Sequence, residues 1–456
     1  MTMRILTLGA VLSVVAITSL AVGSVTAAEK PRQIFDTEVE NTIRDFATPV
    51  LLAAGLEPEA VRVHLVNSTA PNAFVSRGQR LFVTTGLLMA AEHPGQVIGT
   101  LAHETGHIAG GHLARLDTML RDATTPALLS SLLAVAVGVL SGEPAAGVAV
   151  MGGGQQAINR RLLSFSRNQE QAADRAAIRY LDDTRQSARG LMEFLEYLDD
   201  QQALVISRAR QQELSYDITH PLTPGRITYV RQHVERSPYS DVPVKPEFVR
   251  RHARVVAKLH GFLDHPRRSL SQYKATNKSV PARYARAIAY YRQSDLDRAL
   301  PLIDGLLAEW PGDPYFLELK GQALFENGRI AEALEPYQEA VRGLPNARLL
   351  RIGLAHVQIE LNRADMIRPA LANLQQALRI DRAVPIAWRL AAIAYGRDGQ
   401  LGQSALASAE HASYTGRPQD ARRMAERAQR LLKKGSPGWL RAADILNTIK
   451  PRRKGR

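Results

Sequence analysis

The stretch PGQVIGTLAHETGHIAGGH, residues 94–112, predicts a helix that carries the candidate catalytic residues of the chain. Pro94 suits the first position of a helix, and apolar residues follow it at helical spacing, so a helix is expected here. His103 and His107 are four residues apart, which puts both imidazoles within about 40° of each other on one helix face. Two such imidazoles can share a metal ion, and Glu104 lies beside them as a candidate general base, which is the HExxH pattern of zinc sites.

A catalytic zinc ion needs a third protein ligand and one open position. One candidate ligand is His112, which falls one residue short of metzincin spacing and on a continuing helix points roughly 140° away from His107. The other is Glu170, on a helical stretch expected from Gln169 to about Tyr197. Glu170 and Asp174 are four residues apart, so one can bind the metal while the other accepts the free N–H of a ligating histidine.

The composition narrows the class of protein. The chain has 456 residues, of which 45% are hydrophobic and 22% charged, the balance of a globular protein with two or three domains. It has 58 Lys and Arg against 44 Asp and Glu, a net charge of +14 that favours anionic neighbours. Because it has no Cys, disulfides and thiolate metal sites are excluded, and any metal must be held by His, Asp or Glu.

The amino terminus has the plan of a secretory signal peptide. Within residues 1–28, Arg4 precedes an apolar run from Ile5 to Val22, and small residues follow. We expect cleavage near Ala27, with an uncleaved anchor as the alternative, because the apolar run approaches the ~20 residues that span a bilayer. Either outcome predicts an exported chain, which argues against a nucleic-acid partner and leaves membrane association open.

Two β-like runs, Val61–Val66 and Leu81–Thr84, predict a small sheet ahead of the Pro94 helix. Between residues 126 and 154 the only charge is Glu143, and both apolar pieces are shorter than the ~20 residues needed to span a bilayer. We expect a buried or substrate-facing hairpin there, with a lipid-dipping loop as the alternative. Pro221, Pro224, Pro243 and Pro246 punctuate a loop and linker region that ends near Val280, and the linker itself is expected over 241–279.

The last third of the chain is periodic. Four positions recur after 34 residues: Ala287, Tyr290, Ala299 and Pro311 return as Gly321, Leu324, Ala333 and Pro345. This pattern resembles tetratricopeptide repeats, which we expect over 280–450 as helix pairs with a concave face for peptides or partners. The basic tail, 451–456, has no aromatic residues for base stacking, so a solvated or lipid-touching tail is expected.

About sixty residues after HExxH, the stretch FSRNQEQAAD (165–174) completes a resemblance to the HtpX-type gluzincin peptidases. Further matching blocks are Asn72-Ala73-Phe74, Thr85-Gly86-Leu87-Leu88, and Thr219-His220-Pro221 with Arg226. The resemblance spans roughly 35–235. With a signal peptide in front and repeats behind, the chain resembles the exported, BepA-type branch of that family rather than the multi-spanning branch.

This resemblance implies a mainly α chain. An α+β zincin-type metalloprotease domain with a small sheet occupies 29–240, and an α-solenoid of repeats follows. It implies one zinc ion per chain, held by His103, His107 and Glu170, with Glu104 as the catalytic base. His220 is expected near the metal as a second catalytic residue, either stabilising the oxyanion or occupying the open position. Asp174 and Arg226 are expected just outside the ligand set, and the strand around Phe82 is expected to pair with substrate.

The function that the resemblance implies is a periplasmic zinc endopeptidase with a chaperone-like role in the quality control and assembly of outer-membrane β-barrel proteins. Its implied partners are unfolded or misassembled outer-membrane proteins, the outer-membrane assembly machinery through the repeats, and peripheral membrane contacts. The alternative is a binding scaffold or chaperone, in which the repeats act and the protease domain is latent.

Overall fold

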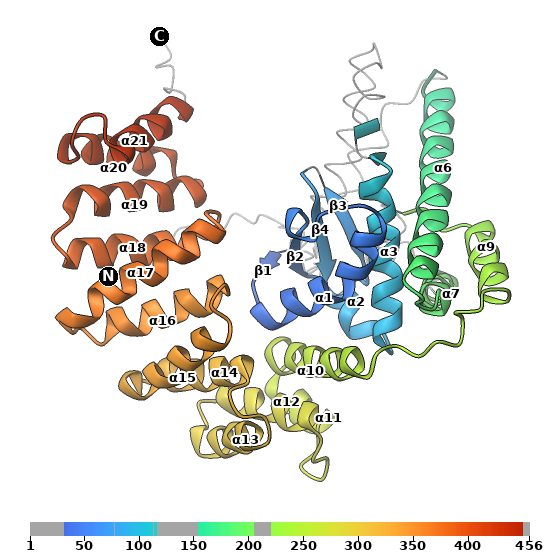
Figure 1. Cartoon of the computed structure of the whole chain (residues 1–456), viewed down its shortest axis with the longest axis horizontal. Helices are drawn as coiled ribbons and strands as arrows, with labels where there is room; N and C mark the ends of the chain where they lie inside the picture. The colour runs from blue at the N-terminus through green and yellow to red at the C-terminus, as the bar shows by residue number, and fades with distance from the viewer. Residues whose placement is uncertain (1–31, 77, 113, 116–153, 205–219, 450–456) are drawn as a thin grey trace, which may run out of the picture.

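A computed structural model shows a small sheet flanked by helices, followed by a curved array of paired helices (Figure 1). The residues that it describes are 32–76, 78–112, 114–115, 154–204 and 220–449. The predicted fold class, mainly α with a small sheet and a helical solenoid, is confirmed. The expectations for 1–28 and 451–456 lie outside the described residues, as does that for 126–154 except at Gly154. Of the helices that are described, none combines the length and the apolar character needed to cross a membrane.

Four strands form one mixed sheet in the order β1-β2-β4-β3. They are β1 (Arg32–Ile34), β2 (Arg62–Asn67), β3 (Ala73–Ser76) and β4 (Arg80–Thr84). β2 and β4 are parallel, whereas β1 and β3 run antiparallel to their neighbours. Side chains alternate between the two faces, so Leu65 and Val83 are buried in the core while His64 and Phe82 are half-buried on the other face.

The expectation that the strand around Phe82 pairs with substrate is wrong. That strand, β4, lies inside the sheet, with β2 hydrogen-bonded to one edge and β3 to the other. Its backbone groups are therefore already paired along both edges. The strands at the two ends of this sheet are β1 and β3.

The Pro94 helix is α3 (Pro94–Ala109), and it lies deep in the domain. Pro94 occupies its first turn and the His93 side chain caps it by accepting from Gly95 N. α3 packs against α1 (Thr37–Ala53), β3 and the helices that follow it. One contact is very close, because a Cβ added at Gly106 would lie 2.8 Å from the carbonyl oxygen of Ala173.

The helical stretch expected from Gln169 to Tyr197 consists of two helices. α6 (Gly154–Asp183) carries Glu170 and Asp174, and α7 (Arg189–Leu204) follows it. The helical conformation is interrupted between them, where Arg185 has a φ of 53°. Hydrophobic spacing alone did not reveal this break, because both helices bury apolar side chains in the same core.

Residues 241–279 are largely helical rather than an extended linker. After α9 (Pro224–Val234), the segment forms α10 (Pro246–Leu263) and α11 (Pro266–Gln272). Of the prolines that suggested a loop, Pro224 and Pro246 stand in the first turns of α9 and α10, and Pro266 likewise begins α11, where a missing N–H costs nothing. α10 buries Phe248 and Val255 in the core of the sheet domain, so it is part of that domain's packing.

The repeat region is a run of antiparallel helix pairs. The helices are α12 (Val280–Tyr291), α13 (Leu296–Glu309), α14 (Pro314–Glu326), α15 (Ile330–Gly343), α16 (Arg348–Glu360), α17 (Ala364–Ile380), α18 (Pro385–Arg397), α19 (Leu401–Tyr414), α20 (Pro418–Leu431) and α21 (Pro437–Thr448). The small residues that repeat in the sequence are the points of closest approach. A Cβ at Gly321 would lie 2.6 Å from the ring of Tyr337.

A buried polar network, which we call the junction network, joins the two parts of the chain. Its members are Asp36, Glu38, Glu40, Arg254, Lys258, Tyr284, Asp313 and Arg348. Lys258 Nζ lies 2.8 Å from Asp36, and Arg254 bridges Glu38 at 2.9 Å and Asp313 at 2.7 Å. Arg348 reaches Glu40 at 2.9 Å, so the first helix of the chain binds directly to the repeats.

Candidate metal centre

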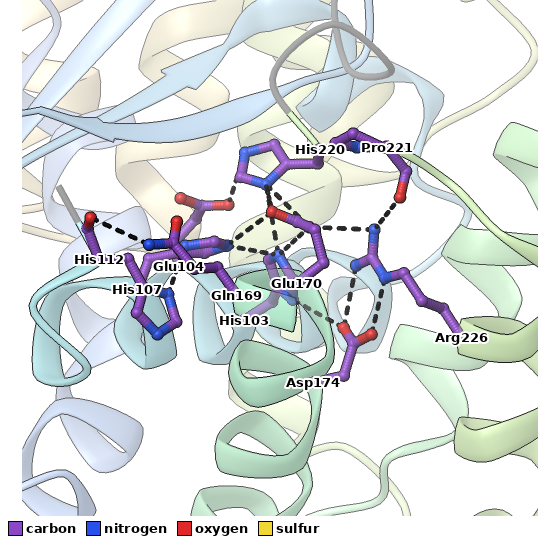
Figure 2. Close-up of polar contacts among 10 residues, drawn as sticks. All are labelled: His103, Glu104, His107, His112, Gln169, Glu170, Asp174, His220, Pro221 and Arg226. Atoms are coloured by element: carbon purple, nitrogen blue, oxygen red, sulfur yellow. Dashed lines mark hydrogen bonds and ion pairs between the residues drawn. The ribbon is translucent and has the colours of Figure 1, made fainter. Parts of the chain in front are cut away.

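Four buried side chains converge between α3, α6 and the segment before α9 (Figure 2). His103, His107, Glu170 and His220 each present one potential ligand atom, and these atoms all lie within 4.8 Å of one another. Among the described residues, no other group of His, Asp, Glu or Cys forms such a cluster. The predicted third ligand, Glu170, therefore lies together with the two histidines of the HExxH motif.

The α-helical spacing aims both imidazoles at one point. His103 Nε2 and His107 Nε2 lie 3.0 Å apart. Glu170 faces both, with Oε2 at 3.2 Å from His103 Nε2 and Oε1 at 3.3 Å from His107 Nε2. Burial works against a charged His103, but Asp174 and Glu170 raise its pKa to about 9, whereas burial lowers the pKa of His107 to about 3.

Asp174 lies one helical turn after Glu170 and contacts the far side of His103. Its Oδ1 lies 2.8 Å from His103 Nδ1, so the carboxylate accepts that N–H and leaves Nε2 free to face the cluster. Burial would raise the pKa of Asp174, but Arg226 holds it at about 2. Asp174 therefore lies outside the cluster of four and contacts it through His103.

Arg226, near the start of α9, ties the two acids of α6 together. It is fully buried and donates from Nε and Nη2 to Asp174 at 2.7 and 2.9 Å. Nη1 lies 3.1 Å from Glu170 Oε2 and also donates to the carbonyl of Pro221 at 3.2 Å. The guanidinium thus compensates two buried carboxylates and fixes the segment that carries His220.

His220 and Glu104, the two predicted catalytic residues, lie side by side. His220 Nε2 lies 3.3 Å from Glu104 Oε1, and His220 Nδ1 lies 3.2 Å from Glu170 Oε1. Glu104 is completely buried, and burial raises the pKa of its carboxyl group. The site therefore brings a candidate base within reach of the same point that the ligand atoms face.

His112, the alternative ligand, lies on the other side of His107. α3 ends at Ala109, and Gly111 adopts a φ of 61°, so the chain turns back instead of continuing as a helix. His112 Nδ1 then lies 2.9 Å from His107 Nδ1, away from the cluster. Sequence reasoning missed this contact, because it depends on the turn at Gly111 and not on helical spacing.

The donor set suits zinc, which prefers imidazole nitrogen and carboxylate oxygen when thiolates are absent. Two Nε2 atoms and one carboxylate converge from two helices, and the ring nitrogens away from the cluster are already held by Asp174 and His112. Such partners fix the tautomer of a ligating histidine. The residues present therefore fit a bound metal ion.

Comparison with known families agrees with this geometry. Residues 35–234 match peptidase family M48, and residues 284–348 match the tetratricopeptide repeat. The chain therefore carries a metallopeptidase domain of family M48 followed by tetratricopeptide repeats, which confirms the resemblance stated from the motifs.

Curated relatives align with large parts of the chain. A beta-barrel assembly-enhancing protease of Yersinia pestis is 24% identical over 410 residues, covering 88% of this chain and 82% of that protein. The protein of the same name from Escherichia coli (strain K12) is 26% identical over 303 residues, covering 65% of this chain and 60% of its own length. Among solved structures, MamA matches 36% of this chain at 16% identity with a TM-score of 0.28, a likeness too low to carry an argument.

Proposed function

We propose that the chain is a zinc endopeptidase whose metal ion is held by His103, His107 and Glu170. The observation that carries this proposal is the convergence of buried donor atoms beside Glu104. When bound, zinc supplies a Lewis acid that acidifies a water molecule and polarises the carbonyl of the scissile bond. One ion per chain is proposed, since the described residues contain one such cluster.

Proton transfer and the positioning of the ligands are carried out by residues of the chain itself. Glu104 takes a proton from the attacking water and returns it to the leaving amine, the role of a positioned general base and acid. Asp174 holds the Nδ1–H of His103, so that its Nε2 stays directed at the metal. Arg226 keeps Asp174 ionised and in place through its paired hydrogen bonds.

His220 can act in two ways, one with a substrate bound and one in the resting site. As a donor it can stabilise the oxyanion that forms on the scissile carbonyl. In the arrangement described, however, its Nδ1 lies among the ligand atoms, and a catalytic zinc needs one position free of protein. We therefore propose that His220 occupies that position at rest and shifts toward Glu104 when a substrate carbonyl enters.

The same observation favours a second candidate function. If His220 stays in the cluster, the domain is latent and the repeats act as a binding scaffold or chaperone. Mobility of His220 thus distinguishes the two candidates, and a His220→Ala variant tests it directly.

The substrates that we propose are unfolded or misassembled outer-membrane β-barrel proteins, handled in the periplasm after export by the amino-terminal signal peptide. The names of the relatives support this proposal, and so do the tetratricopeptide repeats of this chain. The repeats would supply the contact with the assembly machinery. We further propose that an extended substrate pairs with β3, which lies at the end of the sheet and packs against α3.

The test is digestion of a denatured outer-membrane β-barrel protein by the zinc-loaded full chain, with Glu104→Gln alongside. Loss of the base should lower the cleavage rate about 10²–10⁴-fold, while zinc content stays at one per chain. Glu57→Gln, an exposed acid outside the site, serves as the matched control.

Each other outcome has a definite meaning. Equal cleavage by wild type and Glu104→Gln would contradict the proposed chemistry. If neither cleaves but both retain zinc, and His220→Ala gains activity, the latent scaffold is supported.

A further inference from the structure

The net charge of the chain is concentrated at its carboxyl-terminal end. Residues 417–456 contain 13 Lys and Arg against 3 Asp and Glu, a net charge of +10. The rest of the repeat array, residues 280–416, contains 15 of each and is neutral. The last repeat and the tail therefore carry most of the +14 of the whole chain.

In α20 the basic side chains lie opposite the packed face. The packed face consists of the fully buried Ala421, Ala425 and Ala428. Arg423, Arg427 and Arg430 repeat the same spacing two residues later, about 200° further around the helix. All three are exposed, so α20 has a basic stripe on its outer face. α20 and α21 lie at the end of the described array (Figure 1).

Much of this charge is not compensated. Arg422 and Arg423 pair with Glu426 and Asp420. Within the described part of the chain, no acidic partner is seen for the four exposed cations around the α20–α21 turn, namely Arg427, Arg430, Lys433 and Lys434. An ordinary solvated face, such as that of the preceding repeats with 15 charges of each sign, mixes both signs.

Two exposed leucines flank the same turn. Leu431 is 48% exposed and Leu440 is 51% exposed, whereas the intervening Leu432 packs on the array. Leu431 follows Arg427 by four residues, so it lies beside the basic stripe. Single exposed leucines are common on protein surfaces. Exposed leucines next to several cations without acidic partners are typical of peripheral membrane surfaces.

We propose that this terminal basic surface, formed by Arg427, Arg430, Leu431, Lys433, Lys434 and Leu440, docks the end of the repeat array on an anionic lipid bilayer. The cations contact lipid phosphates and the leucines enter the boundary between head groups and acyl chains. α20 and α21 lie at the carboxyl-terminal end of the described repeats, whereas the junction network reaches no further along them than Arg348 in α16 (Figure 1).

The test is binding of the full chain to phosphatidylglycerol-containing vesicles and to neutral phosphatidylcholine vesicles by co-sedimentation. Each basic residue near an anionic surface contributes about fivefold in affinity, so the triple variant Arg427→Gln/Arg430→Gln/Lys434→Gln should bind the anionic vesicles about 100-fold more weakly. The matched control, Arg342→Gln/Arg363→Gln/Arg368→Gln, changes net charge equally on an exposed part of the neutral repeats and should stay within about twofold.

A second variant, Leu431→Ser/Leu440→Ser, tests the apolar contribution. It should weaken vesicle binding at high salt, where screening removes most of the contribution from charge. Equal binding by the wild type and the triple Gln variant, both folded by circular dichroism, would overturn the proposal. Binding to inorganic phosphate or to a single-stranded oligonucleotide as tightly as to the vesicles would also overturn it, because the surface would then recognise polyanions in general.

Discussion

At the metal centre, each imidazole of the HExxH motif has one nitrogen facing the cluster and the other held by a neighbour. Asp174 accepts from His103 Nδ1, and His112 Nδ1 contacts His107 Nδ1 at 2.9 Å. These two partners come from different segments and differ in charge, yet both fix which nitrogen faces the cluster. We therefore propose that His112 is a positioning residue for His107.

Removing His112 should weaken metal binding without abolishing it. Loss of a residue that orients a ligating histidine lowers metal affinity about 10- to 100-fold, so His112→Ala should fall in that range. Glu170→Gln removes a charged ligand and should leave no stable complex. Competition with a chromogenic chelator measures both affinities, and equal losses in the two variants would contradict the assignment.

The residues of the site differ in how far the sequence could predict them. His103, Glu104 and His107 follow from one helical motif, and Glu170 with Asp174 follows from a second helix with the same four-residue spacing. His220 and Arg226 were identified by family resemblance, since no local spacing links them to α3. The role of His112 was not predicted, because it depends on a backbone turn at Gly111.

At the scale of elements, the contact between α3 and α6 fixes the distance between the two halves of the ligand set. Gly106 lies within the HExxH motif, and a Cβ there would lie 2.8 Å from the carbonyl oxygen of Ala173. Glu170 is one helical turn before Ala173 on the same helix. A side chain at position 106 would therefore push Glu170 away from His103 and His107.

Gly106→Ala should destabilise the fold by about 1–3 kcal/mol and also lower metal affinity. The matched control is Gly305→Ala in α13, where an added Cβ meets only Arg283 Nη1 at 4.0 Å. That substitution should be neutral or stabilise by about 1 kcal/mol, because Ala favours the helix. Thermal unfolding and metal titration of both variants check the prediction, which fails if Gly106→Ala retains native metal affinity.

α10 contains a histidine that should make stability depend on pH. His252 is buried, its Nε2 lies 3.2 Å from the carbonyl oxygen of Leu88, and burial lowers its pKa from 6.5 to about 4. The unfolded chain therefore binds a proton near pH 6.5 that the native chain excludes until about pH 4. Stability from this group is complete above pH 6.5 and falls with pH to about 4, by about 3 kcal/mol.

The measurement is the difference in unfolding free energy between wild type and His252→Gln across this pH range. The difference should change in favour of the variant as pH falls, because Gln can still donate to Leu88 O but does not titrate. The metal-site histidines are common to both proteins and cancel. A difference that does not vary with pH would exclude His252 as the cause.

The same helix shows how the type of an element can be mispredicted even where the apolar spacing fits. The spacing of Phe248 and Val255 is helical, yet Pro243 and Pro246 just before them favoured a linker. Proline at the first turn of a helix and proline in a loop give the same sequence pattern. Only the burial of α10 against the sheet domain distinguishes them.

At the scale of the whole molecule, the junction network makes the metallopeptidase domain and the repeats one unit. Lys258 is buried and lies 2.8 Å from Asp36, 3.4 Å from Glu38 and 3.9 Å from Glu318. These carboxylates raise the pKa of Lys258 well above its usual value in spite of burial. Its charge therefore compensates acids contributed by both parts of the chain.

Lys258→Met should destabilise the whole chain by about 3–5 kcal/mol, since it leaves buried carboxylates without their cation. Lys320→Met is the control, because Lys320 pairs with Asp304 at 2.8 Å on the surface, where loss of the pair should cost at most about 1 kcal/mol. Denaturant unfolding of both variants, followed by zinc release and by circular dichroism, measures the effect. Equal midpoints for the two variants would contradict it.

The junction network also affects when α1 completes its packing as the chain folds. Glu38 bonds to Tyr284, Asn41 to Tyr315 and Glu40 to Arg348, so the first helix finds its partners 246, 274 and 308 residues later. Contacts this distant in sequence close late, because the chain must search a long loop before they form. Because the amino terminus emerges first, we expect α1 to remain incompletely packed until the third helix pair has emerged. The folding of the peptidase domain would thereby be completed only after the repeats that contact it are present.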